Sequence, residues 1–160
     1  MPGRLRGFAK VAGPDTRIVV LVDEDRQDCT ALKETLEAAA AQANLTTKSA
    51  AAADQGFVVL NRIVVEELEA WFFGDCEALR AAYPRVSTSL EKKAGFRHPD
   101  SIAGGTWEQL ERVLQQAGYH RAGLAKIVAG QDIAQHMDPD RNISPSFRQF
   151  CNGLRALAKQ

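Results

Sequence analysis

The chain has 160 residues, of which 45% are hydrophobic and 25% charged, and its 20 basic residues balance its 20 acidic ones. This length suits one domain with a real core, over residues 1–160. Zero net charge excludes a global field that would attract nucleic acid or an anionic membrane, so such a partner needs a local basic patch. No apolar run approaches the roughly 20 residues of a membrane span.

The first half of the chain reads as strand, helix, strand. Residues 18–22 are apolar and β-branched, which predicts a buried strand, and residues 57–65 predict a second one. Between them, Thr30 suits the N-cap of a helix over residues 30–43. This order within 48 residues is what a parallel crossover needs, so the fold class is α/β.

The second half of the chain is predicted to be helical. One helix spans residues 66–82 and stops before Pro84, and residues 84–105 form a long loop that is functional or mobile. Thr106 and Gln109 suit a capping box for a helix that ends near residue 118. Another helix starts near residue 124, and a final one has Ser144 as cap and Pro145 in its first turn.

Three cysteines, Cys29, Cys76 and Cys151, lie far apart. Their odd number and spacing predict reduced thiols in a cytoplasmic protein rather than a disulfide framework. Each is expected to be a small core residue.

Asp23 and Asp25 directly follow the first strand, with Glu24 between them. Ligands of open parallel sheets bind beyond the carboxyl ends of strands, and alternate residues of an extended segment point the same way. Two carboxylates with open water positions suit Mg²⁺ or Mn²⁺. The alternative is a solvated turn whose aspartates cap the next helix.

Glu69 is the unusual acid of the helix predicted over residues 66–82. At about 100° per residue it lies only about 40° from the centre of the apolar stripe, whereas Glu67 lies on the opposite face. A carboxylate at the edge of a core needs a cation, a basic partner or a raised pKa. Glu69 is therefore either a metal ligand or the partner of an arginine, and Glu66 lies at the junction with the strand, where it also faces the sheet's edge.

Four segments together resemble a bacterial family, domain of unknown function 4276: "VVLVDEDRQDC", "NRIVVEELEAWFFGD", "GYHRAG" and "SPSFRQF". That family looks like a divergent branch of the TOPRIM fold of topoisomerases, primases and OLD-type nucleases. The resemblance implies a Rossmann-like, TOPRIM-type parallel sheet with flanking helices and a helical C-terminal part. It also implies a magnesium site.

The resemblance assigns roles to particular residues. Asp23, Asp25 and Glu69 would be catalytic and would bind the metal, with Glu66 as a further candidate ligand. Arg121 would stand where the family has a lysine, and an arginine there keeps the charge but changes the donor geometry. Apart from the resemblance, the local run of basic residues makes Lys92, Lys93 and Arg97 candidates, together with Arg121, for holding a DNA or RNA backbone, although the loop that carries the first three also fits a solvated surface.

The resemblance also implies that the usual first strand, which ends in a catalytic glutamate, is missing here. The first functional hypothesis is a nuclease-like, magnesium-dependent domain that works beside an ATPase partner in phage defence or DNA maintenance. The second is a non-catalytic docking subunit that uses an apolar patch on the helix of residues 147–157. The third is a receiver- or dehalogenase-type phosphotransfer domain, which wants more strands after Asp25 than the sequence offers.

Overall fold

The computed structural model describes residues 2–25 and 27–160. In this part of the chain, seven α-helices accompany a parallel sheet of two strands, which confirms the α/β class and the helical C-terminal part. The chain forms two compact units. The first contains residues up to Ile63 together with Gln149–Gln160, and the second contains Val64–Arg148.

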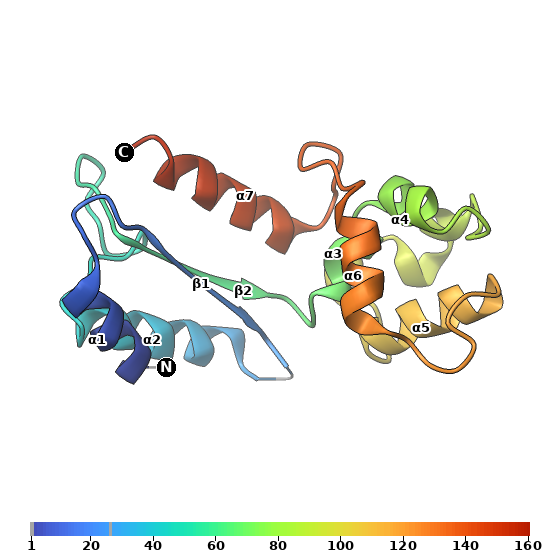
Figure 1. The fold of residues 1–160 in the computed structure, drawn as a ribbon, viewed down its shortest axis with the longest axis horizontal. Coiled ribbons are helices and arrows are strands. Elements are labelled where there is room, and N and C mark those ends of the chain that lie inside the picture. Colours follow the sequence, from blue (N-terminus) through green and yellow to red (C-terminus); the bar gives the residue numbers. More distant parts are fainter. Residues whose placement is uncertain (1, 26) are drawn as a thin grey trace. The chain divides into compact units, whose positions relative to one another are not determined.

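The first unit is built around the parallel sheet. Its elements are listed in chain order: α1 (Pro2–Val11), β1 (Ile18–Asp23), α2 (Cys29–Ala41), β2 (Val59–Val64, of which residues up to Ile63 belong here) and the part of α7 (Pro145–Leu157) from Gln149 onward. Helices α1 and α2 lie on one side of the sheet and α7 lies on the other (Figure 1). Both predicted strands and the helix between them are confirmed.

The two strands differ in how far they are covered. In β2, Val59 packs with side chains of α1 and α2, and Leu60 packs with Leu157 of α7 on the opposite face. In β1 only Val20 is fully buried, while Val19 and Leu21 are 40% and 39% exposed. The prediction of a buried first strand is therefore wrong for one of its faces, because α7 covers β2 rather than β1.

The second unit is helical. Its α-helices are α3 (Glu69–Phe73), α4 (Cys76–Ala82), α5 (Thr106–Gln116) and α6 (Lys126–Ala134). The segment over residues 84–105 carries three 3₁₀ turns, η1 (Leu90–Lys92), η2 (Ala94–Phe96) and η3 (Pro99–Ser101). Leu90 and Ile102 of this segment are 2% and 3% exposed and belong to the core of the unit. Residues 84–105 thus form an irregular segment that packs into the core of the unit.

The single helix predicted over residues 66–82 is two helices, α3 and α4, and Asp75 explains the break. Its carboxylate caps α4 by accepting from the backbone N–H of Ala78, accepts from the N–H of Asp138, and binds the Arg141 guanidinium through Nε and Nη2 at 2.8 and 2.9 Å. Asp75 is 1% exposed. Its carboxylate is therefore a buried structural group.

The segments "WFFGD" and "NISPSF" bind each other in the second unit. The Trp71 indole Nε1 donates to Ser146 Oγ at 2.8 Å, and the Trp71 ring meets the Phe147 ring edge-on with centroids 5.0 Å apart. The Asn142 side chain donates to the Trp71 carbonyl, and the Ile143 N–H donates to the Gly74 carbonyl. Two sequence segments 70 residues apart thus form one structural motif.

Helix starts follow the predictions in part. Ser144 lies before α7, and its Oγ accepts from the Phe147 N–H, as expected of a cap. Helix α2 is capped by Asp28 rather than Thr30, because Asp28 Oδ1 accepts from the Ala31 N–H at 2.7 Å. Helix α5 has Gly105 at its N-cap, so the expected capping box is not formed.

Burial of the cysteines matches the expectation for two of three. Cys76 and Cys151 are buried, and burial raises the pKa of the Cys76 thiol to about 12. Cys29 is exposed, which corrects its placement in the core. All three are free thiols. Within the described residues, no helix has the length and apolar character that crossing a membrane requires.

Gly153 lets α7 approach β2 closely. A Cβ at this position would lie 2.7 and 2.8 Å from the Leu60 methyl carbons and 2.9 Å from Arg62 Nη2. We expect Gly153→Ala to lower the free energy of unfolding by about 1–3 kcal/mol through overpacking. Gly7→Ala is the matched control, because this helical position has nothing within 4 Å and should gain up to about 1 kcal/mol from helix propensity. Urea denaturation measures both, and equal stabilisation would contradict the close approach.

The Asp75–Arg141 pair makes stability depend on pH. Burial alone would raise the pKa of Asp75, but hydrogen bonds from Arg141 and two backbone N–H groups outweigh it and lower that pKa. The pair therefore stabilises the protein above the unfolded-state pKa of about 3.9, and this contribution is lost as the pH falls through the lower folded-state value. We expect Arg141→Met to lower the free energy of unfolding by about 3 kcal/mol at pH 7.

In Arg141→Met the buried Asp75 carboxylate has lost its cation, and protonation in acid removes this unfavourable charge. The difference from the wild type should shrink below about pH 5 in thermal melts. Arg80→Met is the control, since Arg80 pairs with the partly exposed Glu91 and its loss should stay below about 1 kcal/mol. A constant difference across the pH range would contradict the role given to Asp75.

Candidate functional site

Asp23 and Asp25 lie at the carboxyl end of β1, in the first unit. Asp23 is the last residue of the strand, and Asp25 follows in a turn with a φ of 49°; both are exposed. The expected alternation of an extended segment thus ends at Asp23. Because Asp28 is the N-cap of α2, the alternative that made Asp23 or Asp25 the helix cap is not what the structure shows.

The backbone at Asp25 is in the left-handed region, which costs an L-residue about 1–2 kcal/mol. Glu66 also has a positive φ, 62°, at the junction between β2 and α3. Two of the four predicted acidic site residues therefore occupy backbone positions that glycine would fill more easily. Strained backbone positions cluster at functional sites, and Asn44 and His120 also have a positive φ.

Glu66 and Glu69 belong to the second unit, so the four predicted acids are divided between the two units. Glu69 is 7% exposed in the first turn of α3, which confirms that it lies at the edge of the core. Its Oε1 is 3.8 Å from the Lys126 ammonium, and that ammonium lies 4.4 Å from the centre of the Trp107 ring. The basic partner is thus a lysine, where an arginine was the stated alternative to a metal.

Glu67 has a structural task that helix geometry did not suggest. Its carboxylate accepts from Thr106 Oγ1 at 3.1 Å and from the Trp107 N–H at 3.0 Å, so it caps the start of α5. The expectation of a solvated Glu67 assumed one continuous helix over residues 66–82, but α3 starts only at Glu69. Because Glu67 precedes the helix, the helical spacing of about 100° per residue does not determine where its side chain points.

No group of three His, Cys, Asp or Glu side chains that could hold a metal ion occurs among the residues that the structure describes. Asp23 and Asp25 nevertheless offer the donor set that Mg²⁺ accepts when it keeps several waters. Glu69 fits a metal less well, because the Lys126 ammonium shares its carboxylate. The metal ligands therefore stay a prediction, with Asp23 and Asp25 as its core.

The four residues predicted to bind the nucleic-acid backbone come from two segments of the second unit. All are exposed, and three come from the segment of η1 and η2 while Arg121 lies in the turn before α6: Lys92, Lys93, Arg97, Arg121. Arg97 Nε donates to the Lys92 carbonyl and lines a small hollow of about 180 Å³ beside η3. Lys93 lines a different hollow, together with Arg85 and Arg112. Sequence reasoning missed these two arginines, because Arg85 lies in the turn after α4 and Arg112 lies on α5, away from the basic run of residues 92–97.

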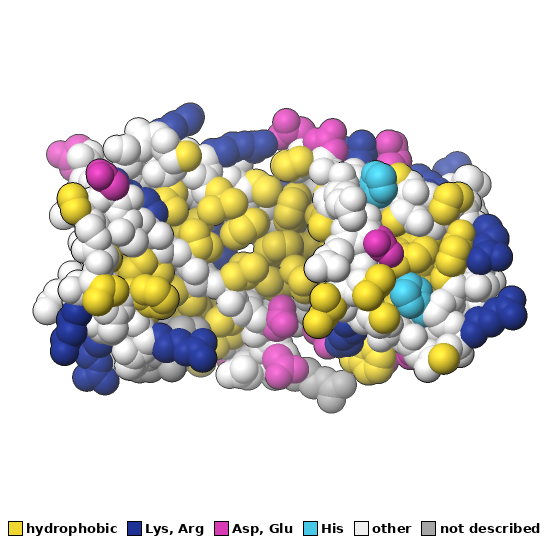
Figure 2. Space-filling view, viewed as in Figure 1, with side chains coloured by type: hydrophobic (Ala, Val, Ile, Leu, Met, Phe, Trp, Pro, Cys, Tyr) yellow, Lys and Arg dark blue, Asp and Glu magenta, His cyan; other side chains and the backbone are white. Residues whose placement is uncertain are grey.

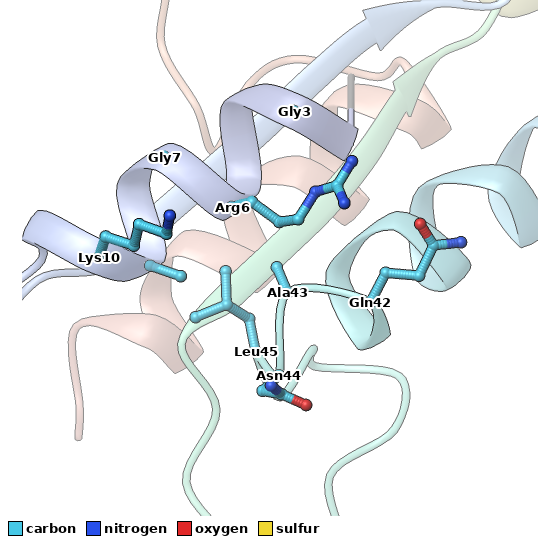
Figure 3. Close-up of a pocket in the computed structure, with 9 residues that line it drawn as sticks. Gly3, Arg6, Gly7, Lys10, Gln42, Ala43, Asn44 and Leu45 are labelled. Atoms are coloured by element: carbon cyan, nitrogen blue, oxygen red, sulfur yellow. The ribbon is translucent and has the colours of Figure 1, made fainter.

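The first unit has a basic recess of its own, of about 820 Å³ (Figure 3). Arg6 and Lys10 of α1 lie one helical turn apart on one side of it, and residues 42–45 after α2 line the other. Four of its lining residues lack long side chains, Gly3, Gly7, Ala9 and Ala43, which leaves the recess wide and shallow. Sequence reasoning did not identify this recess, since its two halves are more than 30 residues apart.

We expect Asp25→Gly to be at least as stable as the wild type, because glycine adopts a positive φ without strain. Asp25→Ala is the control, since it removes the same carboxylate but keeps the left-handed cost. Glycine should exceed alanine by about 1 kcal/mol in urea denaturation. A glycine variant clearly less stable than the wild type would mean that the Asp25 carboxylate stabilises the fold, and the argument for a functional role would fail.

Comparison with known proteins gives one family. The sequence model of a family described as a domain of unknown function (DUF4276) matches residues 2–155. No curated protein and no solved structure matches the chain. Since the match spans nearly all of the 160 residues, the chain belongs to this DUF4276 family.

Proposed function

We propose that this chain is a TOPRIM-like domain that processes phosphodiester bonds in nucleic acid with Mg²⁺ or Mn²⁺ held at Asp23 and Asp25. The single observation that carries the proposal is the placement of both carboxylates at the carboxyl end of a parallel strand, with Asp25 in a conformation that favours glycine. Carboxyl ends of parallel strands are where ligands of α/β sheets bind. Strained backbone at such an end suggests a retained function.

The residues would divide the work as follows. Asp23 and Asp25 would bind the ion directly, and water would fill its remaining positions. The bound ion supplies polarisation of the phosphate and neutralises charge on the transferring oxygens. Exposed cations of the second unit would hold the nucleic-acid backbone. An ATPase partner belongs to the same proposal and rests on the resemblance to TOPRIM-type proteins alone.

A docking subunit without catalysis is the second candidate, and exposed apolar side chains favour it. Val19 and Leu21 of β1 are about 40% exposed, and Ile127 and Val128 of α6 are 78% and 49% exposed. The patch expected on the helix of residues 147–157 is not available, because its apolar stripe is buried; Phe147, Cys151 and Leu157 are each 8% exposed. A phosphotransfer domain ranks last, since in the described chain only β2 follows Asp25.

Titration of Mg²⁺ and Mn²⁺ tests the proposal. We expect saturable heat of binding and a rise in melting temperature for the wild type, with affinity reduced at least about tenfold in Asp23→Asn, because a carboxylate oxygen is a far better ligand than an amide. Asp54→Asn removes an exposed aspartate from a turn of the same unit and should bind as the wild type does. Glu69→Gln should weaken binding less than Asp23→Asn, since Lys126 already shares that carboxylate.

Cleavage of labelled DNA and RNA strands then tests the activity itself. Products that need the divalent ion and disappear in Asp23→Asn would support the enzyme. Equal cleavage by the variant would indicate a contaminating nuclease. A folded wild type that binds neither ion would reject the metal site and favour the docking subunit.

A further inference from the structure

A hollow of about 310 Å³ in the second unit collects three cations at its rim and apolar side chains at its base. The cations are Arg85, Lys93 and Arg112, and the lining includes no aspartate or glutamate. Leu90 and Val113 of the base are buried, and Phe96 is partly buried beside them. In Figure 2, Lys and Arg side chains gather at the right-hand edge of the view, over the ends of α4 and α5, with hydrophobic side chains beside them.

Three other cations of the unit are paired with carboxylates. Arg80, Lys126 and Arg141 all form ion pairs, with Glu91, Glu69 and Asp75 respectively. Among the residues that the structure describes, no carboxylate lies within 4.0 Å of the charged nitrogens of Arg85, Lys93 or Arg112. Their positive charge is therefore uncompensated, in a chain whose net charge is zero.

Neutral groups fix two of these side chains in place. The Arg85 guanidinium lies 4.2 Å from the centre of the Tyr119 ring, and its Nη2 donates to the Gly118 carbonyl at 3.2 Å. Arg112 Nη1 donates to Gln109 Oε1 at 3.2 Å. Partners without charge orient a guanidinium and leave its charge available. Such preorganisation lowers the entropic cost of binding an anion, and guanidinium groups match phosphate oxygens well.

The apolar side chains at the bottom of the hollow restrict the kind of anion that would fit there. A free phosphate would use the cations but not the surface of Leu90, Phe96 and Val113, whereas a nucleotide unit places a phosphate and a base within one small site. The volume lies at the lower end of the range for ligand pockets. A nucleobase that is stacked and paired in a duplex cannot enter a hollow of this size. An unstacked nucleobase of a single strand can.

We propose that this hollow of the second unit binds one nucleotide unit of single-stranded nucleic acid. The phosphate would lie on Arg85, Lys93 and Arg112, and the nucleobase would lie over Phe96. The inference rests on the proposed function and gives it a substrate class, single-stranded DNA or RNA. It also changes the set of residues that were predicted to bind the nucleic-acid backbone. Lys93 stays in the set, Arg85 and Arg112 enter it, and Lys92 and Arg121 lie outside the recess.

Fluorescence anisotropy with labelled oligo-dT and oligo-U of 15 nucleotides, in EDTA, tests this site apart from metal binding and cleavage. We expect Arg85→Gln with Arg112→Gln to weaken binding about tenfold or more. The slope of log affinity against log salt should become shallower by about 1.4, from about 0.7 for each lost phosphate contact. The matched control is Arg6→Gln with Lys10→Gln, which removes two charges from the other recess and should change affinity less than about threefold.

Two further arms test the chemistry of the recess. Phe96→Leu keeps an apolar side chain but removes the aromatic face, and should weaken binding several-fold. Arg85→Lys keeps the charge and should lose less than Arg85→Gln. Melting temperatures check that each variant is folded. We expect the arginine variants to fold, because Arg85 and Arg112 are exposed.

Several results would overturn the proposal. Equal losses in both double variants would show binding by overall charge, and a duplex of the same length that binds as tightly would reject a single-strand site. Displacement of the oligonucleotide by an equal nucleotide concentration of the mononucleotide would assign the recess to a small molecule instead. Failure of metal binding in the Asp23 experiments would leave these measurements unchanged, so the two proposals fail separately.

Discussion

The buried carboxylate of Asp75 is the interaction on which the second unit depends. Taking a charge out of water is costly unless a cation and further donors surround it, and Asp75 collects Arg141 and two backbone N–H groups. This arrangement ends α3, starts α4 and fixes the chain after α6. With that chain in place, Asn142 and Ile143 bond to Trp71 and Gly74. The most distinctive stretch of the sequence, "EAWFFGD", thus serves mainly to hold the unit together.

Many acidic side chains have structural partners, and among the predicted site residues this holds for Glu69. Glu67 caps α5, Glu69 faces Lys126, and Asp100 accepts from Ser144 Oγ and from the Ser146 N–H at the start of α7. In the first unit, Glu37 pairs with Lys33 and accepts from Asn61. These interactions account for acids that composition alone would leave open. Asp23 and Asp25, in contrast, are exposed at the carboxyl end of β1, and Arg85 and Arg112 are exposed around the hollow of the second unit.

The two surfaces have complementary chemistry. An enzyme that processes phosphodiesters needs acidic ligands for a metal and cations for the backbone. The first unit carries Asp23 and Asp25 at the end of a parallel strand, and the second carries Arg85, Lys93 and Arg112 around an apolar hollow. Glu69 is where this scheme differs most from the TOPRIM-type assignment, because a lysine already balances its charge. The family description itself names no activity, so these surfaces are where function is to be sought.

Elements with strong local patterns follow from the order of the residues alone. The β-branched runs became β1 and β2, Ser144 with Pro145 marked the start of α7, and helical arithmetic placed Glu69 at the edge of a core. These features follow from periodicity and capping, which depend on neighbouring residues. Only the tertiary structure decided the break at Asp75, the exposure of one face of β1, the capping by Glu67 and the gathering of Arg85 with Arg112. Each of these depends on a partner distant in sequence, as with Arg141, 66 residues beyond Asp75, and no local pattern encodes that distance.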